Sequence, residues 1–147
     1  MEQSNGCEEI KVFIATPEHA EEISRLNELF NDVRISSIEM ARRLGEVHAP
    51  EIAIIAWCKR GAVAFAGLRI VTSLFYDSPH AEITELFVQE DFRQRGIGRL
   101  LIGKSIEVRP ASATMTNRWG AFRVAWPPGR SGCWIIVVGT LLQTGCR

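Results

Sequence analysis

The most constraining feature of this sequence is a glycine-rich turn between a predicted strand and a predicted helix. An apolar run at 83–88 indicates the strand, and apolar residues at 100–102 begin the helical pattern. The turn between them contains Gly96 and Gly98. The first N–H groups of a helix have no acceptor within the helix, and the helix dipole favours negative charge at that end. Because glycine carries no Cβ, an anion can approach these groups closely. The segment therefore predicts a phosphate site.

Three arginines, Arg93, Arg95 and Arg99, surround this turn. Their guanidinium groups add positive charge there, and we expect them to steer an anion and to add a modest share of the affinity. The alternative interpretation is a solvated helix face on which they balance Glu90 and Asp91. Under either interpretation, the backbone N–H groups of the turn are the main predicted contact.

The strand ends in Leu86-Phe87-Val88, and Arg93, Gly96 and Gly98 follow it. This pattern resembles the signature of the GCN5-related N-acetyltransferase (GNAT) superfamily, in which Arg/Gln-x-x-Gly-x-Gly/Ala follows a strand ending in Leu-x-Val. In that family the loop holds the pyrophosphate of acetyl-CoA, and the strand pairs with the pantetheine arm through its backbone. The resemblance thus implies the following acetyl-CoA-binding residues: Leu86, Phe87, Val88, Arg93, Gln94, Arg95, Gly96, Ile97, Gly98 and Arg99.

The resemblance extends upstream and covers roughly residues 10 to 108. It implies an α/β fold, more strictly a layered α+β fold, in the order β-α-α-β-β-β-α. The expected sheet is mixed and mostly antiparallel, with helices on both faces and an irregular C-terminal part. A Rossmann-type dinucleotide turn is disfavoured because Leu101 stands where a third Gly or Ala is required. Apolar runs and turn signals predict strand 10–15, a helix beginning at Thr16-Pro17, a helix capped by Ser36 or Ser37 and ending near Gly45, strands 52–58, 62–74 and 83–88, and a helix after Gly98.

The two helices before the second predicted strand show apolar residues at helical spacing. Acidic residues on these helices would suit a cationic substrate, although they are equally consistent with plain surface: Glu28, Asp32 and Glu39. The predicted buried faces are Ile23, Leu26, Leu29, Phe30 and Val33 in the first helix, and Ile38, Met40, Ala41 and Leu44 in the second.

At 147 residues, the chain is predicted to be a single domain, 1–147. Within it we expect a flexible N-terminus at 1–9, a core at 10–108 and an atypical tail at 109–147. The first residues do not resemble a signal peptide, and no apolar run is long enough to span a bilayer. The four cysteines show no metal-like pairing. We therefore expect a cytoplasmic protein with neither a metal nor a membrane partner.

Charge is divided unevenly along the chain, although the formal net charge is zero. Residues 1–108 contain twelve Lys/Arg and seventeen Asp/Glu, a net charge of minus five, whereas residues 109–147 contain five Arg and neither Lys nor acid. At typical acidic content, so long a stretch without any acid is expected roughly once in a hundred. Scattered arginines among apolar residues are a poor footprint for nucleic acid, so we do not expect a nucleic acid partner.

In the GNAT family the corresponding tail carries a fifth strand, a helix with Asn-x-x-Ala-x-x-x-Tyr and then Gly-Phe. Asn117 is present, but the other positions of that motif do not match. One interpretation is a shift of reading frame near codon 108. The other is a divergent tail in which residues 121–126 and 134–138 supply late strands. Tyr76, the only tyrosine, lies in a predicted turn rather than at the family's tyrosine position.

Transfer of an acetyl group to an amine needs a base, because a lysine-like amine has a pKa of about 10.4 and is protonated at neutral pH. Glu82 and Glu85 are the candidates. In a regular strand, residues three apart face opposite sides of the sheet, so at most one of them faces the acceptor unless a bulge resets the alternation. The resemblance implies Glu82 as the base of histone-type members and Glu85 as the acid of aminoglycoside-type members. We favour Glu85.

The resemblance implies an acetyl-CoA-dependent N-acetyltransferase that acts on a small amine by direct transfer, with a glutamate as general base. The side chains of Leu86 and Val88 are expected to be ordinary core, because the strand would contact pantetheine through its backbone. Two alternatives stay open. One is a non-catalytic or degraded relative that binds CoA or forms a homodimer without turnover, and the other is an interaction module whose tail pairs with a second subunit.

Overall fold

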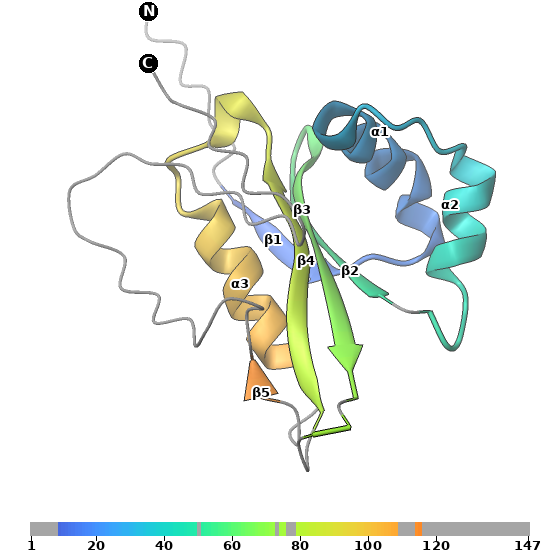
Figure 1. The fold of residues 1–147 in the computed structure, drawn as a ribbon. Helices are drawn as coiled ribbons and strands as arrows, with labels where there is room; N and C mark the ends of the chain where they lie inside the picture. The colour runs from blue at the N-terminus through green and yellow to red at the C-terminus, as the bar shows by residue number, and fades with distance from the viewer. Residues whose placement is uncertain (1–8, 50, 73, 76–78, 109–113, 116–147) are drawn as a thin grey trace, which may run out of the picture.

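The computed structural model describes residues 9–49, 51–72, 74–75, 79–108 and 114–115. Within them, five strands form one sheet in the order β1-β2-β3-β4-β5 (Figure 1). Strands β1 to β4 pair antiparallel, and β5 runs parallel to β4. Along the chain the elements are β1 (Lys11–Ile14), the 3-10 helix η1 (Pro17–His19), α1 (Ala20–Asn31), α2 (Ser37–Leu44), β2 (Glu51–Cys58), β3 (Gly61–Val71), β4 (His80–Val88), the 3-10 helix η2 (Glu90–Phe92), α3 (Ile97–Val108) and β5 (Thr114–Met115).

The predicted order of elements and the mostly antiparallel sheet are confirmed from β1 to α3. In the tail, the described part is β5 alone. Several sequence predictions lie outside the described residues: the N-terminus at 1–8, Tyr76, Asn117, the candidate late strands at 121–126 and 134–138, and the change of reading frame.

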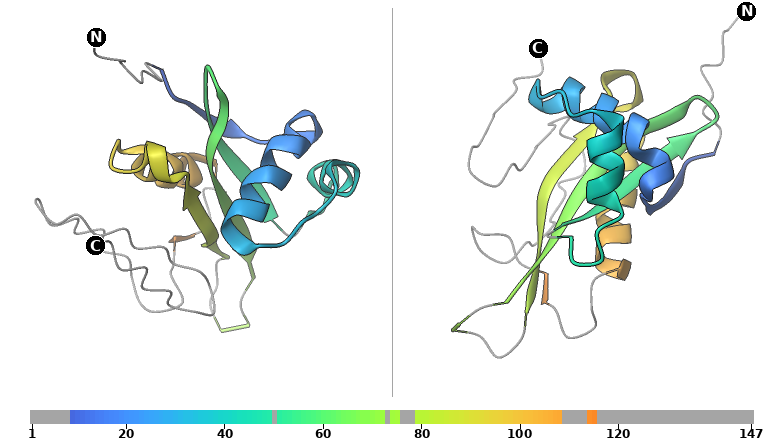
Figure 2. Two further views of the ribbon diagram at one scale, coloured as in Figure 1. Left: turned by 90° about the horizontal axis from the view of Figure 1, so that it is seen from above. Right: turned by 90° about the vertical axis from the view of Figure 1, so that its right-hand side faces the viewer.

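The sheet separates two layers of helices, with α1 and α2 on one face and α3 on the other (Figure 2). We call these the α1/α2 face and the α3 face. Side-chain alternation along β2 explains the division, because Ile54 belongs to the core on the α3 face and Ile55 to the core on the α1/α2 face. Both isoleucines are fully buried. The same alternation in β3 and β4 decides which side chains reach each layer.

The predicted helix starts at Thr16-Pro17 and at Ser36 are confirmed, whereas α3 begins at Ile97, one residue before Gly98. Ser36 caps α2, since its Oγ accepts a hydrogen bond from the Glu39 N–H at 3.2 Å. At the start of η1, the Thr16 N–H donates to His19 Nδ1 at 3.0 Å. The His19 ring also lies 5.1 Å from the Phe13 ring and 5.7 Å from the Trp57 ring, centroid to centroid. His19 therefore helps to fix this corner of the fold.

Three predictions of burial are wrong: Leu29, Val33 and Ile38 are 57%, 51% and 83% exposed. Leu29 lies roughly 120° around α1 from the buried Ile23, so it falls outside the buried stripe. Val33 comes after the end of α1, where Asp32 adopts a left-handed conformation with φ of 54°. Ile38 lies roughly 200° around α2 from the buried Met40 and therefore points away from the sheet.

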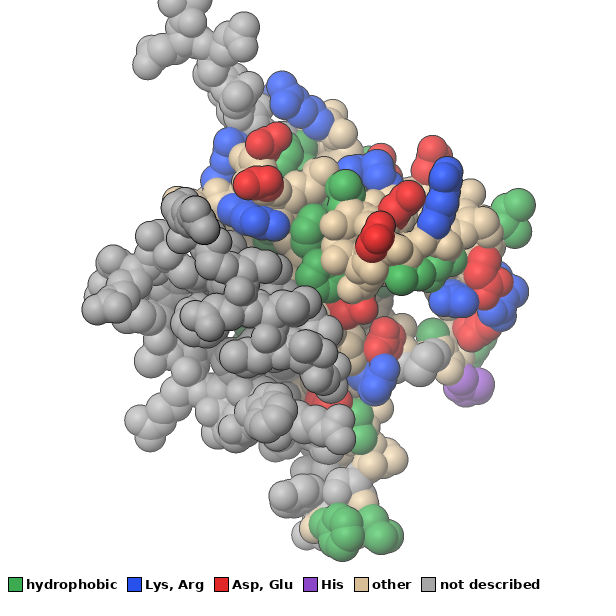
Figure 3. Space-filling view, turned by 45° about the horizontal axis from the view of Figure 1, so that its top comes forward, with side chains coloured by type: hydrophobic (Ala, Val, Ile, Leu, Met, Phe, Trp, Pro, Cys, Tyr) green, Lys and Arg blue, Asp and Glu red, His purple; other side chains and the backbone are tan. Residues whose placement is uncertain are grey.

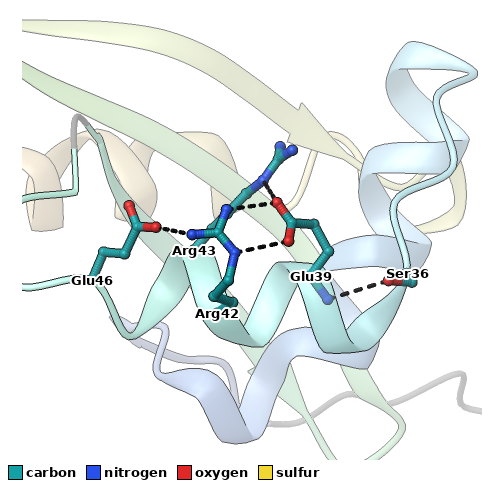
Figure 4. Close-up of polar contacts among 5 residues, drawn as sticks. All are labelled: Ser36, Glu39, Arg42, Arg43 and Glu46. Atoms are coloured by element: carbon teal, nitrogen blue, oxygen red, sulfur yellow. Dashed lines mark hydrogen bonds and ion pairs between the residues drawn. The ribbon is translucent and has the colours of Figure 1, made fainter.

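The polar face of α2 forms a network of exposed ion pairs (Figure 4). Glu39 accepts hydrogen bonds from Arg42 and Arg43 at 2.8 Å each, and Arg42 also bonds Glu46. These bonds from Arg42 and Arg43 lower the pKa of the Glu39 carboxyl to about 2. Exposed pairs of this kind contribute little to stability. Since Glu39 is occupied by arginines of its own helix, it is a poor candidate for binding a cationic substrate.

Candidate functional site

The predicted phosphate loop runs from η2 into α3, and two of its residues have left-handed backbones. Gln94 has φ of 62° and Gly96 has φ of 78°. The Leu100 N–H donates to the Gly96 carbonyl at 3.1 Å, so Gly96 caps α3 and Ile97, Gly98 and Arg99 form its first turn. A Cβ added at Gly96 or Gly98 would meet no described atom within 4 Å. Packing therefore does not require glycine at position 98. An anion bound at the helix N-terminus would favour glycine there, because the missing Cβ lets it approach the N–H groups closely.

The arginines of the loop differ in their surroundings. Arg93 is partly buried, and its Nε donates to the Val88 carbonyl at 2.9 Å, which joins the loop to the end of β4. The exposed Arg95 guanidinium lies over the Phe92 ring, 5.4 Å from its centroid. Arg99 is exposed in the first turn of α3. Bracing of the loop by Arg93 was not predicted from the sequence, because the motif gives a position for this arginine but no partner.

The apolar residue inside the loop, Ile97, points into the protein. It is 2% exposed and belongs to the core on the α3 face together with Leu101. This side chain anchors the first turn of α3 against the sheet, so the N–H groups of that turn are held by packing. Such preorganisation favours anion binding because little conformational entropy is lost when the anion arrives.

The C-terminal half of β4 presents backbone groups along the edge away from β3. The Gln89 N–H donates to the Val63 carbonyl of β3 at 2.9 Å, and alternation then turns the Leu86 and Val88 backbone groups toward the opposite edge. In the described part of the chain, β5 pairs with β4 only at His80 and Ala81. Arg93 occupies the Val88 carbonyl. The Leu86 N–H and carbonyl and the Val88 N–H therefore lie on this edge outside the pairing of the described strands.

The side chains of this half-strand are core, as predicted. Leu86 and Val88 pack against the core on the α3 face. Phe87 lies on the α1/α2 face, where its ring centroid is 5.2 Å from that of Phe30 and 6.1 Å from that of Phe65. Any contact of these three residues with a ligand at the β4 edge would therefore be made mainly through the backbone.

A β-bulge changes the prediction for the two glutamates. Gly67 of β3 pairs with Glu85, but the next residue, Leu68, pairs with Ile83, so Thr84 is the extra residue of the bulge. Arg69 then pairs with Glu82. Since directly opposed residues share a face, and Gly67 and Arg69 lie on one face of β3, both glutamates lie on the α1/α2 face. The regular-strand expectation of opposite faces is wrong here, and the exception for a bulge applies.

Glu85 is half-buried and held by α1. The Asn31 Nδ2 donates to Glu85 Oε1 at 3.2 Å and to Asn27 Oδ1 at 2.9 Å, while Asn27 Nδ2 donates to the Val33 carbonyl at 2.8 Å. Burial raises the pKa of the Glu85 carboxyl above its ordinary value, and the negative charge of Glu51 acts in the same direction, against the lowering by the Asn31 bond. A carboxylate in this setting is a stronger base than one in water. Sequence reasoning missed Asn31, since nothing in its spacing marks it.

One protein-family model matches most of this chain. The model described as the acetyltransferase (GNAT) family matches residues 15–113. The chain belongs to this family. Its enzymes use acetyl-CoA, and the match contains both the glycine loop and β4. No curated protein matches the chain.

Solved structures show the same fold. A ribosomal-protein-alanine N-acetyltransferase from Brucella melitensis biovar Abortus 2308 superposes with a TM-score of 0.59 at 16% identity, over 81% of this chain and 84% of that one. An aminoglycoside acetyltransferase from an uncultured soil metagenomic sample, in complex with sisomicin, gives 0.58 at 16% identity, over 74% and 77%. A GNAT family acetyltransferase from Staphylococcus aureus gives 0.58 at 16% identity, over 84% and 96%.

Two further features of the described residues concern a membrane and a metal. None of their helices has the length and hydrophobicity needed to cross a membrane. Among the same residues, no group of three or more His, Cys, Asp or Glu side chains could hold a metal ion.

Proposed function

We propose that this chain is an acetyl-CoA-dependent N-acetyltransferase that transfers the acetyl group directly to a small amine. The observation that carries the proposal is the arrangement around β4. The strand continues into the glycine loop at its C-terminal end, offers backbone groups at one edge, and presents the half-buried Glu85 on the α1/α2 face. These are the three parts that acetyl transfer requires: a phosphate site, a thioester site and a base.

The residues present fit acetyl-CoA. The first-turn N–H groups of α3 at Gly98 and Arg99 would bind the pyrophosphate, with Arg95 and Arg99 adding positive charge. The backbone of Leu86 and the Val88 N–H would pair with the pantetheine arm. Acetyl-CoA supplies the activated acetyl group as a thioester. One of these N–H groups would donate to the carbonyl oxygen of the thioester as negative charge develops on it.

We assign Glu85 as the general base, directly or through one water. An amine that arrives protonated must lose a proton before its nitrogen can form the C–N bond, and Glu85 accepts that proton. The C–S bond then breaks and the thiolate of CoA leaves. The nitrogen gives up its second proton to solvent as the amide forms, and the thiolate takes up a proton from solvent. Glu82 lies on the same face of the sheet and is the alternative base. The chain is proposed to be a single domain, 1–147, with its core at 10–108.

Thermal unfolding with and without acetyl-CoA tests this proposal. Acetyl-CoA at about a hundred times its Kd should stabilise the protein by roughly 2.7 kcal/mol. In Gly96→Glu this stabilisation should disappear, since the substitution places a negative charge and an unfavourable φ at the phosphate site. The matched control is Gly103→Glu, which adds the same charge two turns further along α3, where a Cβ would also meet no described atom.

The second readout is release of free CoA in the presence of an amine panel. Stabilisation together with release supports the proposed enzyme. Stabilisation without release from any amine favours a relative that binds CoA without turnover. If acetyl-CoA does not stabilise the native chain, both readings are wrong.

The compartment stays a prediction from the sequence.

A further inference from the structure

Glu85 is joined to the end of α1 by three consecutive side-chain hydrogen bonds. Asn31 Nδ2 donates to Glu85 Oε1 at 3.2 Å and to Asn27 Oδ1 at 2.9 Å. Asn27 Nδ2 donates in turn to the Val33 carbonyl at 2.8 Å. Val33 follows Asp32, whose left-handed backbone ends α1. These bonds therefore connect the turn after α1 with the proposed base, and we call Asn27 and Asn31 the amide pair.

The direction of each bond follows from the groups that take part. A backbone carbonyl can only accept, so Asn27 must turn its amide nitrogen to Val33 and its oxygen to Asn31. The Asn31 nitrogen then gives one hydrogen to Asn27 and the other to Glu85. Because this nitrogen can only donate, Glu85 Oε1 must accept and cannot hold a proton directed at Asn31. Glu85 Oε2 has no hydrogen bond to another described residue, so it is the oxygen open to a proton.

Apolar packing holds the two ends of this connection together. Phe30 is next to Asn31, and its ring centroid lies 5.2 Å from that of Phe87 on β4. Phe87 is two residues from Glu85 and therefore lies on the same face of the sheet. The Phe30 ring also lies 6.0 Å from the Phe65 ring of β3, centroid to centroid. Since these contacts hold the backbones in place, the amide pair has the task of orienting the Glu85 carboxylate.

We propose that Asn27 and Asn31 are positioning residues that fix Glu85 Oε1 and leave Oε2 to take the proton of the amine. This inference rests on the proposed function. The proton moves from the ammonium nitrogen to Oε2, directly or through one water, and the freed electron pair of the nitrogen forms the C–N bond. Oε2 later gives this proton to solvent. Asn31 acts on the base directly, whereas Asn27 acts through Asn31.

The first test measures kcat against pH, by release of CoA, in Asn31→Ala and Asn27→Ala. The Asn31 bond lowers the pKa of the Glu85 carboxyl. Asn31→Ala should therefore move the acid limb to higher pH by about one unit, because a hydrogen bond to a charged group is lost. Its kcat on the plateau should fall about tenfold as the carboxylate loses its orientation, while the KM for acetyl-CoA should change less than about twofold. Asn27→Ala should shift the limb in the same direction by less, because the Asn31 amide can then rotate.

The double variant Asn27→Ala/Asn31→Ala separates positioning from damage to α1. In the Asn31→Ala background, Asn27→Ala should shift the acid limb no further, because its effect passes through the Asn31 amide. Leu29→Ala is the control, since it truncates a side chain of the same helix that is 57% exposed, and it should leave the limb in place. An equal shift by Asn27→Ala in both backgrounds, or a shift in Leu29→Ala as large as in Asn31→Ala, overturns the inference.

None of these substitutions changes an ionisable group. Acidic and basic side chains are interspersed over the described surface around α1 and α2 (Figure 3). Those on or beside the elements around Glu85 are the same in every variant: Glu51, Arg69, Glu82, Glu28, Asp32 and Arg34. A shift of the acid limb therefore reports the amide pair and not a change in neighbouring charge.

An NMR titration of the Glu85 carboxyl carbon measures the same midpoints without acetyl-CoA or an amine. The resonance is identified by its absence in Glu85→Gln. A higher midpoint in Asn31→Ala, and a smaller rise in Asn27→Ala, support the inference. An unchanged midpoint in Asn31→Ala overturns it and leaves the proposed function standing where CoA is released. Absence of release from any amine by the wild type overturns the proposed function, and with it the role of the amide pair in the reaction.

Discussion

The two sides of β4 serve the proposed reaction in different ways. On the side of α3, the Leu86 and Val88 side chains are core, and the groups available to a ligand are backbone atoms of the strand edge and of the helix N-terminus. On the α1/α2 face, the groups available are side chains, above all the Glu85 carboxylate. Side-chain substitutions should therefore affect stability on the first side and chemistry on the second.

The largest effect that this contrast predicts is on the rate of Glu85→Gln. Loss of a general base lowers kcat by about 10² to 10⁴-fold. Stabilisation by acetyl-CoA should be retained, because Glu85 faces away from the phosphate loop. Glu82→Gln is the matched comparison on the same face, and single-turnover rates of the two variants measure the difference. A larger loss in Glu82→Gln would transfer the role of base to that residue.

On the other side of the strand, Leu86→Ala should act through packing. Leu86 is partly buried, and truncation of a core leucine lowers the free energy of unfolding by about 2 kcal/mol or more. The Kd of the folded protein for acetyl-CoA should change less than about twofold, since the backbone contact is unaltered. Urea unfolding and a titration of the folded protein measure the two quantities. A tenfold weaker Kd with unchanged stability would contradict the division between the two sides.

Two buried hydroxyls provide a smaller and sharper comparison. Thr84 Oγ1 and Ser24 Oγ both have no hydrogen-bond partner among the described residues. Removal of each, by Thr84→Val and Ser24→Ala, should raise the free energy of unfolding by roughly 1 kcal/mol, because a buried hydroxyl without a partner is destabilising. Urea unfolding of the two variants and of the wild type measures this gain. A lower free energy of unfolding in either variant would contradict the absence of a partner for that hydroxyl.

The smallest expected effect concerns pH. The Asn31 bond lowers the pKa of Glu85 against the stronger effect of burial, so Asn31→Ala should move the acid limb of the kcat profile to higher pH. The sign for stability follows from the raised pKa. The folded protein holds its proton to a higher pH than the unfolded chain, so the wild type loses stability as pH rises through the folded pKa of Glu85. Glu85→Gln should therefore gain stability relative to the wild type as pH rises above about 4.3. A constant difference would contradict this titration.

The sequence predicted one side of β4 better than the other. Gly96 and Gly98 mark the predicted phosphate loop, because a positive φ at Gly96 and an open helix N-terminus at Gly98 restrict the residue type directly. The face of Glu82 could not be predicted, since it depends on the pairing of β3 with β4 rather than on its own neighbours in sequence. Nor could the contacts of Asn31 with Glu85 or of Arg93 with Val88, because both join residues through the tertiary fold. Periodicity likewise placed Ile23 and Leu26 in the core but could not locate the end of α1 before Val33.

The bulge at Thr84 also limits how residue roles can be compared between relatives. An alignment anchored on Leu86-Phe87-Val88 sets Glu82 against whichever residue lies six positions before the valine in each relative. In a relative whose strand lacks the extra residue, that position points to the opposite face of the sheet. Counting residues back from Val88 can thus transfer functional roles between relatives only as far as Glu85. Upstream of it, they must be transferred by strand register, with the residue opposite Arg69 as the equivalent of Glu82.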